Sequence, residues 1–111
     1  MTNSTIDMTL FKELQDTAGV DFAAELVGTF FEEAPLMLAE LRSAQASASA
    51  DKFRRAAHSL KTNADTFGAT HLGQLARELE LSGVPASAAA LGPLEAAYQD
   101  AAKALQEILH G

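Results

Sequence analysis

The stretch DKFRRAAHSLKTNADTF, residues 51–67, decides the fold because its apolar positions recur with the period of an α-helix. On a wheel of 100° per residue, one arc holds all of the apolar positions, namely Phe53, Ala56, Ala57, Leu60, Ala64 and Phe67. His58 lies roughly 150° from the centre of that arc. The stretch therefore predicts an amphipathic helix whose histidine faces away from the core.

Basic residues gather around His58, although the net charge of the chain is −7. Arg54 and Arg55 lie one helical turn before it, and Lys61 lies one turn after it. Positive charge close to an imidazole disfavours its protonated form and leaves more of the neutral, nucleophilic ring. The same cations favour a phosphoryl group once it is attached, with Lys61 balancing charge on its oxygens. An exposed histidine beside basic residues is nevertheless more often ordinary surface than a functional site.

The rest of the chain also has the pattern of helices. Composition is 48% hydrophobic and 21% charged, with only three prolines, and no stretch alternates as a strand does. Helices are expected over residues 8–15, 21–44, 51–67, 70–82 and 88–109. Short connections favour antiparallel neighbours, so an all-α fold is predicted: an antiparallel up-down four-helix bundle with a short additional N-terminal helix. The length suits a single domain of residues 1–111.

Turn and cap residues set the expected boundaries. Asp7, Asp51 and Thr70 are expected to cap the helices that follow them. Pro35 lies inside the second apolar stripe, where we expect a kink near Phe31 and not a break. Gly68 is expected to end the third helix in the left-handed conformation.

Several classes of function are disfavoured. The acidic net charge argues against nucleic acid as a partner. The absence of cysteine removes disulfides and the common cysteine-based metal sites. His58, His71 and His110 lack the spacing of a metal motif, so no metal site is expected, and no hydrolase motif is present. Without a signal-peptide pattern or a long apolar run, we expect a cytoplasmic protein that does not enter the membrane.

The segment AAHSLKTNADTFGATHLGQLARELE, residues 56–80, resembles the signature of histidine-containing phosphotransfer domains, the relay modules of multistep phosphorelays. That signature is an Ala-His-x-Leu-Lys-Gly core, a glycine ten residues after the histidine, a leucine four residues later, and a Leu-Glu or Leu-Gln pair. The matching positions are His58, Leu60, Lys61, Gly68, Leu72, Leu79 and Glu80. Weaker similarity extends over residues 29–41 and 6–14, and the starting methionine favours a free-standing protein over a piece of a larger kinase.

The resemblance implies a role for each matching residue of the site. His58 would be phosphorylated on its ε nitrogen, and Lys61 would be the neighbouring charge balancer. Glu80 stands where the family often has a glutamine that hydrogen-bonds the other ring nitrogen, and its negative charge would oppose that of the cations. Thr62 replaces the family glycine after the lysine, which adds bulk beside His58 and could narrow partner choice, slow transfer or disable the relay.

The resemblance also implies partners. The phosphoryl donor would be the receiver domain of a hybrid histidine kinase, and the acceptor would be the receiver domain of a response regulator. Magnesium would belong to those receivers, so no cofactor is expected here, and the chain would be a monomeric phosphocarrier without kinase activity of its own. Partner contacts are expected from Arg54, Arg55, Thr62, Phe11 and Asp65, with Phe30 a further candidate for which core packing is the more probable role. The alternative is a helical adaptor that binds a receiver or a kinase without accepting phosphate.

Overall fold

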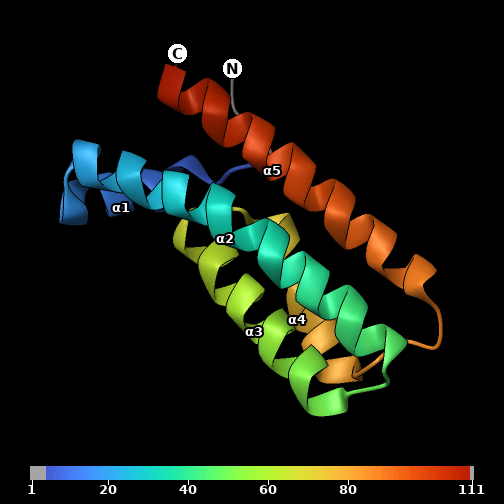
Figure 1. Cartoon of the computed structure of the whole chain (residues 1–111). Coiled ribbons are helices and arrows are strands. Elements are labelled where there is room, and N and C mark those ends of the chain that lie inside the picture. The colour runs from blue at the N-terminus through green and yellow to red at the C-terminus, as the bar shows by residue number, and fades with distance from the viewer. Residues whose placement is uncertain (1–4, 111) are drawn as a thin grey trace.

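The computed structural model describes residues 5–110, which form helices and no strand. The elements are α1 (Met8–Ala18), α2 (Val20–Ala46), α3 (Ala50–Thr66), α4 (Thr70–Ser82), a short 3₁₀ turn η1 (Ala88–Leu91) and α5 (Gly92–His110). Figure 1 shows α2, α3 and α5 running along the long direction of the molecule, which measures 40 × 24 × 20 Å. The all-helical class predicted from the sequence is confirmed. The ends of the expected domain, residues 1–4 and 111, lie outside the described residues.

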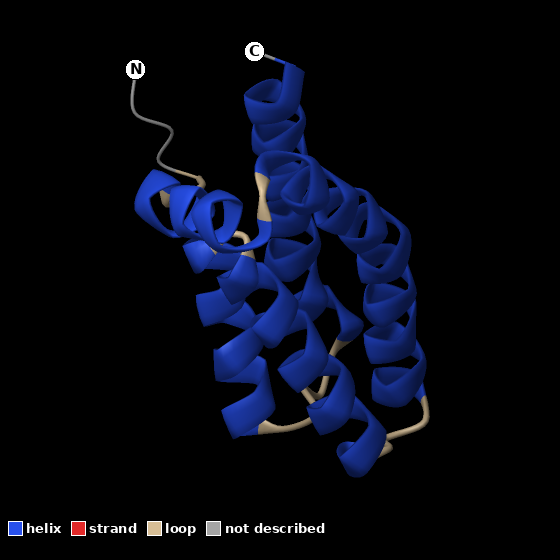
Figure 2. Ribbon diagram, turned by 90° about the vertical axis from the view of Figure 1, so that its left-hand side faces the viewer, coloured by secondary structure: helices blue, strands red, loops and turns tan. Residues whose placement is uncertain are grey.

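The core lies around α3, which packs mainly against α2 and α4, while α5 packs against α4 and α2. Figure 2, turned by 90° from the first view, shows that the elements are helices joined by short loops. The apolar arc of α3 is buried as predicted, at Phe53, Ala56, Ala57, Leu60, Ala64 and the following Phe67. Phe30 of α2 lies at the centre, with its ring centroid 5.1 Å from that of Phe67 and 5.7 Å from that of Tyr98, the latter edge-on. Because one face of α3 is used in this way, its opposite face, with His58, is left at the surface.

The N-terminal helix begins as predicted and ends later. The Asp7 carboxylate accepts a hydrogen bond of 3.0 Å from the backbone N–H of Thr9, which satisfies a free donor of the first turn. The helix continues past residue 15 to Ala18, where Gly19 adopts a φ of 95°. In α2 the chain stays helical through Pro35.

Two of the predicted caps are wrong. Ser49 precedes α3, and Asp51 lies inside its first turn, where a carboxylate still interacts favourably with the helix dipole. Ala69 precedes α4, so Thr70 is the first residue of that helix and not its cap. Near the C-terminal helix, Ser87 accepts a hydrogen bond from the N–H of Ala89 and begins η1, which leads into α5.

Gly68 ties the start of the first helix to the turn between α3 and α4. Its φ is +77°, as the sequence predicts for a glycine at a helix end, and its carbonyl accepts a 2.7 Å hydrogen bond from the N–H of Asp7. A Cβ atom built on Gly68 would lie 2.6 Å from the carbonyl oxygen of Asp7. Both the backbone conformation and the close approach therefore require glycine here.

Replacing Gly68 with alanine should destabilise the protein by more than the left-handed conformation alone costs, which is about 1–2 kcal/mol. The additional loss comes from the collision with Asp7. Gly83 is the matched control, because its φ is +84° but no atom lies within 4 Å of an added Cβ. Urea unfolding of Gly68→Ala and Gly83→Ala measures the difference, and equal losses of stability would contradict the proposed contact with Asp7.

An ion pair joins α2 to α5 across the surface. The Arg42 guanidinium donates two hydrogen bonds to the carboxylate of Glu95, one from Nε and one from a terminal nitrogen. The hydrogen bond from Arg42 holds the pKa of Glu95 below its usual value, and the same bond raises the pKa of Arg42. The pair should therefore contribute stability only while Glu95 is ionised.

The variant Glu95→Gln should be slightly less stable than the parent protein at neutral pH. Because the folded-state pKa of Glu95 is depressed, its contribution is present above the unfolded-state value near 4.5 and is lost as the pH falls through the folded-state pKa. The difference in urea midpoint between the two proteins should thus shrink in acid. A difference that stays constant from pH 7 into the acid range would contradict this assignment.

Candidate functional site

His58 lies in α3 with 55% of its side chain exposed, which confirms the outward orientation predicted from the wheel. Its Nδ1 atom lies 2.8 Å from Oε2 of Glu80 on α4, whose own side chain is only 17% exposed. An ionised carboxylate can only accept a hydrogen bond, so this contact places the ring proton on Nδ1. The lone pair is then left on Nε2.

Lys61 completes a three-residue cluster with His58 and Glu80. Its Nζ atom lies 3.8 Å from Oε1 of Glu80, a distance that suits an ion pair but is too long for a hydrogen bond. One carboxylate therefore interacts with the imidazole through one oxygen and with the ammonium group through the other. Lys61 lies one turn after His58 on the side of α3 that faces α4.

The arrangement of Arg54 and Arg55 differs from the sequence prediction that cations surround the imidazole of His58. Both Arg54 and Arg55 hydrogen-bond the carboxylate of Asp51, one to each oxygen. These bonds, with that from Arg54 contributing most, lower the pKa of Asp51. The expected arrangement is wrong in this respect, because the charged group in direct contact with His58 is the carboxylate of Glu80.

A seam between α3 and α4 runs past the His58–Glu80 contact, with a hollow on each side of it. One hollow, of about 200 Å³, is lined by Lys61 and Asp65 of α3 and by residues of the first two turns of α4. The carboxylate of Asp65 lies over Gly73 of α4, in space that a methyl group on Gly73 would need. The second hollow, of about 340 Å³, lies between the start of α3 and the end of α4.

Thr62 is exposed one turn after His58, and its hydroxyl donates a 3.1 Å hydrogen bond to the backbone carbonyl of His58. This bond holds the Thr62 side chain against its own helix. The ring of His58 remains more than half exposed beside it. The added bulk at this position therefore does not seal the imidazole from solvent.

Phe11 cannot contact a partner, so the prediction of docking through it is wrong, whereas Phe30 packs in the core, the role that the sequence favoured for it. Their side chains are buried at 0% and 1% exposure, because Phe11 packs into the core from α1 and Phe30 lies against Phe67 and Tyr98. A different apolar residue, Leu81, is exposed immediately after Glu80. The sequence carried a signal for it, since Leu81 falls outside the apolar stripe of α4.

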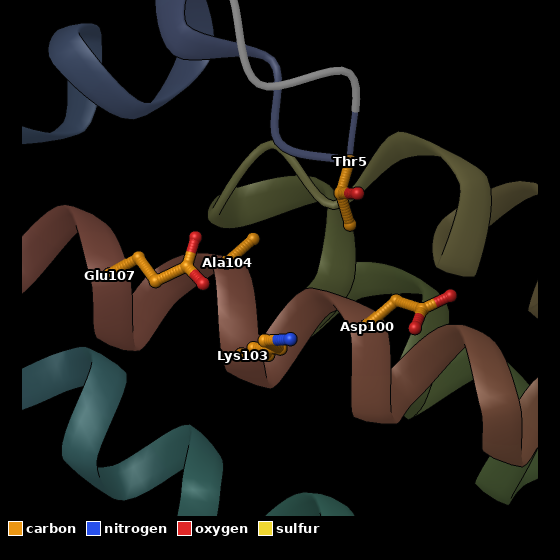
Figure 3. Close-up of a pocket in the computed structure, with 5 residues that line it drawn as sticks. All are labelled: Thr5, Asp100, Lys103, Ala104 and Glu107. Carbon is orange, nitrogen blue, oxygen red and sulfur yellow. The ribbon is translucent and has the colours of Figure 1, made fainter.

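Other parts of the described chain lie apart from this cluster. Figure 3 shows a hollow of about 230 Å³ over α5, where Thr5 faces a row formed by Asp100, Lys103, Ala104 and Glu107.

His71 and His110 are exposed, and residues 5–110 contain no group of three or more acidic, histidine or cysteine side chains arranged to hold a metal. None of the helices in that range is both long and apolar enough to cross a membrane.

Comparison with known proteins gives one match. No curated protein and no solved structure matches the chain. The family model described as Hpt domain matches residues 25–110, which include the whole of α3, α4 and α5. The chain therefore belongs to the Hpt domain family.

Proposed function

We propose that this protein is a phosphorelay intermediate that accepts a phosphoryl group on His58 from an aspartyl phosphate of one receiver domain and passes it to an aspartate of another. Membership of the Hpt family supports a phosphotransfer role. The observation that carries the proposal is the exposed His58 ring, whose Nδ1 is held by Glu80 at 2.8 Å while Nε2 is left free to react.

The transfer step follows from this arrangement. The Nε2 lone pair attacks the phosphorus, the bond from phosphorus to the aspartate oxygen breaks, and its electron pair leaves with the regenerated carboxylate. The ring keeps its Nδ1 proton and becomes positively charged. The Glu80 carboxylate, 2.8 Å away, stabilises that charge. Attack on the phosphohistidine by the second aspartate reverses each change.

Lys61 has a different part in the proposal. Its ammonium group is held near the ring by Glu80, at 3.8 Å, without a close hydrogen bond to that carboxylate. It is therefore free to turn toward the oxygens of an incoming phosphoryl group and balance their charge.

The phosphoryl group must come from another protein, because Hpt domains are phosphocarrier modules without kinase activity. The proposed partners are a receiver domain of a hybrid histidine kinase and that of a response regulator, each supplying its own magnesium, with no cofactor on this chain. Arg54 and Arg55 are exposed beside the site and would attract an acidic receiver, although their pairing with Asp51 reduces that effect. A monomer in the cytoplasm is part of the same proposal.

A receiver-binding adaptor that takes no phosphate remains the second candidate, and Thr62 in place of the family glycine is the feature that favours it. Thr62 stands beside His58 but bonds its own helix, which argues for a tolerated change. Labelling experiments distinguish the two candidates.

Incubation with phosphoramidate, or with phosphorylated receiver domains of the source organism, should label His58 with a phosphate that is labile in acid and stable in base. His58→Gln should abolish labelling with little effect on stability, because the side chain is exposed. His71→Gln is the matched control, since His71 is also exposed, and it should label normally. Transfer from no receiver would favour the adaptor, and equal labelling of His58→Gln would refute the proposed acceptor.

Glu80→Ala should slow the labelling of His58 by about tenfold, the effect of losing one charge-assisted hydrogen bond of roughly 1.5 kcal/mol. Glu80→Gln should restore part of the rate, because the amide oxygen can still accept a hydrogen bond from Nδ1 but no longer supplies a negative charge. Rates measured with phosphoramidate isolate this positioning effect from docking. If Glu80→Gln is as slow as Glu80→Ala, then orientation of the ring is not the role of Glu80.

A further inference from the structure

Asp51 binds two arginines with a single carboxylate. Its Oδ1 atom accepts a 3.0 Å hydrogen bond from Arg54, and its Oδ2 atom accepts a hydrogen bond from Arg55. All three side chains are more than half exposed, so water screens these ion pairs and each is weak. Because Arg55 keeps the carboxylate paired, Arg54 can exchange its partner at little cost.

Arg54 lies on the side of α3 from which His58 is contacted. It precedes Lys61 by seven residues, about two helical turns, so the two cations lie within about 20° of each other around the helix, with His58 between them in the sequence. Arg54 and Glu80 also line the same hollow between α3 and α4, and Glu80 is the residue that contacts His58.

The distance from Arg54 to the imidazole suits a direct contact with a group on the ring. Residues four apart on a helix have Cβ atoms about 5–6 Å from each other. Helical side chains lean toward the N-terminus, so the His58 side chain leans toward the turn that holds Arg54. The long side chain of Arg54 therefore reaches a group that the His58 ring carries.

A phosphoryl group on His58 would be a stronger partner for Arg54 than Asp51 is. Such a group carries about −1.5 to −2 charges near pH 7 and three acceptor oxygens, whereas a carboxylate carries one charge and two oxygens. A guanidinium binds phosphoryl oxygens through two parallel N–H···O bonds. The two anions thus compete for one arginine.

We propose that Asp51 is a positioning residue that competes with the phosphoryl group of phosphorylated His58 for Arg54. On phosphorylation Arg54 exchanges the carboxylate for phosphoryl oxygens, while Arg55 stays on Asp51. The competition lowers the stability of the phosphorylated form and keeps its phosphoryl group easy to pass on. The presence of a phosphoryl group rests on the proposed function, whereas the competition rests on the two hydrogen bonds of Asp51 and the position of Arg54.

Titration of the unphosphorylated protein with inorganic phosphate measures this competition without phosphotransfer. Asp51→Asn should tighten phosphate binding about threefold, because it frees Arg54 from an exposed ion pair, and the NMR signal of the Arg54 Nε–H group should move during the titration. Adding Arg54→Ala to Asp51→Asn should remove the gain. Asp51→Glu should bind phosphate as the parent does, since glutamate also pairs with an arginine three or four residues later.

Asp21→Asn is the matched control for the loss of one negative charge. Asp21 is the second residue of α2, as Asp51 is of α3, and both are exposed acidic residues in the first turn of a helix. Both variants therefore lose the same interaction with a helix dipole. Asp21→Asn should leave the phosphate affinity nearly unchanged.

The same variants are then compared in phosphoryl exchange with a receiver domain of the source organism. The equilibrium constant should shift about threefold toward phosphorylated His58 in Asp51→Asn and stay at the parent value in Asp51→Glu and Asp21→Asn. An unchanged phosphate affinity or an unchanged equilibrium constant in Asp51→Asn would overturn the proposal, and so would an equal gain in Asp21→Asn or in the double variant without Arg54. If phosphate binding changes as expected but His58 is never phosphorylated, the competition for Arg54 is supported and only the phosphotransfer function fails.

Discussion

The burial of one face of α3 between α2 and α4 is the constraint on which the rest of the structure depends. Three alanines on that face, Ala56, Ala57 and Ala64, are almost completely buried, and their small side chains let the neighbouring helices approach closely. With its apolar side occupied, α3 must present His58 to solvent, and with α4 so near, Glu80 can reach the ring from a separate helix.

The site therefore holds one nitrogen of the His58 ring in a fixed contact and leaves the ring exposed to solvent. Glu80 is only 17% exposed and lies on a helix, so its carboxylate is a fixed acceptor for the Nδ1 proton. The other ring nitrogen carries no proton in this arrangement, as the proposed phosphotransfer requires. The charges around the ring are more balanced than a count of basic residues suggests, because Asp51 binds both arginines and Glu80 attracts Lys61. Such balance limits repulsion within the free protein, and in the proposed phosphotransfer it leaves Lys61 able to interact with a phosphoryl group.

The sequence predicted the helices, the buried face of α3 and the outward His58 because all three follow from one period of 3.6 residues. It also placed Gly68, since a left-handed helix end has a strong residue preference. Prediction from the sequence failed where the packing of several helices decides which side chains are buried and which pair with one another. Phe11 was expected to contact a partner, and only the packing of several helices shows that it is buried. The pairing of Arg54 and Arg55 with Asp51 likewise depends on side-chain conformations that spacing alone does not fix.

The central claim is that Glu80 holds the Nδ1 proton of His58 and leaves Nε2 as the nucleophile. Long-range ¹H–¹⁵N correlation spectra of the ring, recorded at about pH 8.5 where imidazoles are mostly neutral, measure this directly. The account predicts a protonated Nδ1 and a bare Nε2 before phosphorylation, and a phosphoryl group on Nε2 afterwards. A proton on Nε2, or a phosphoryl group on Nδ1, would contradict it.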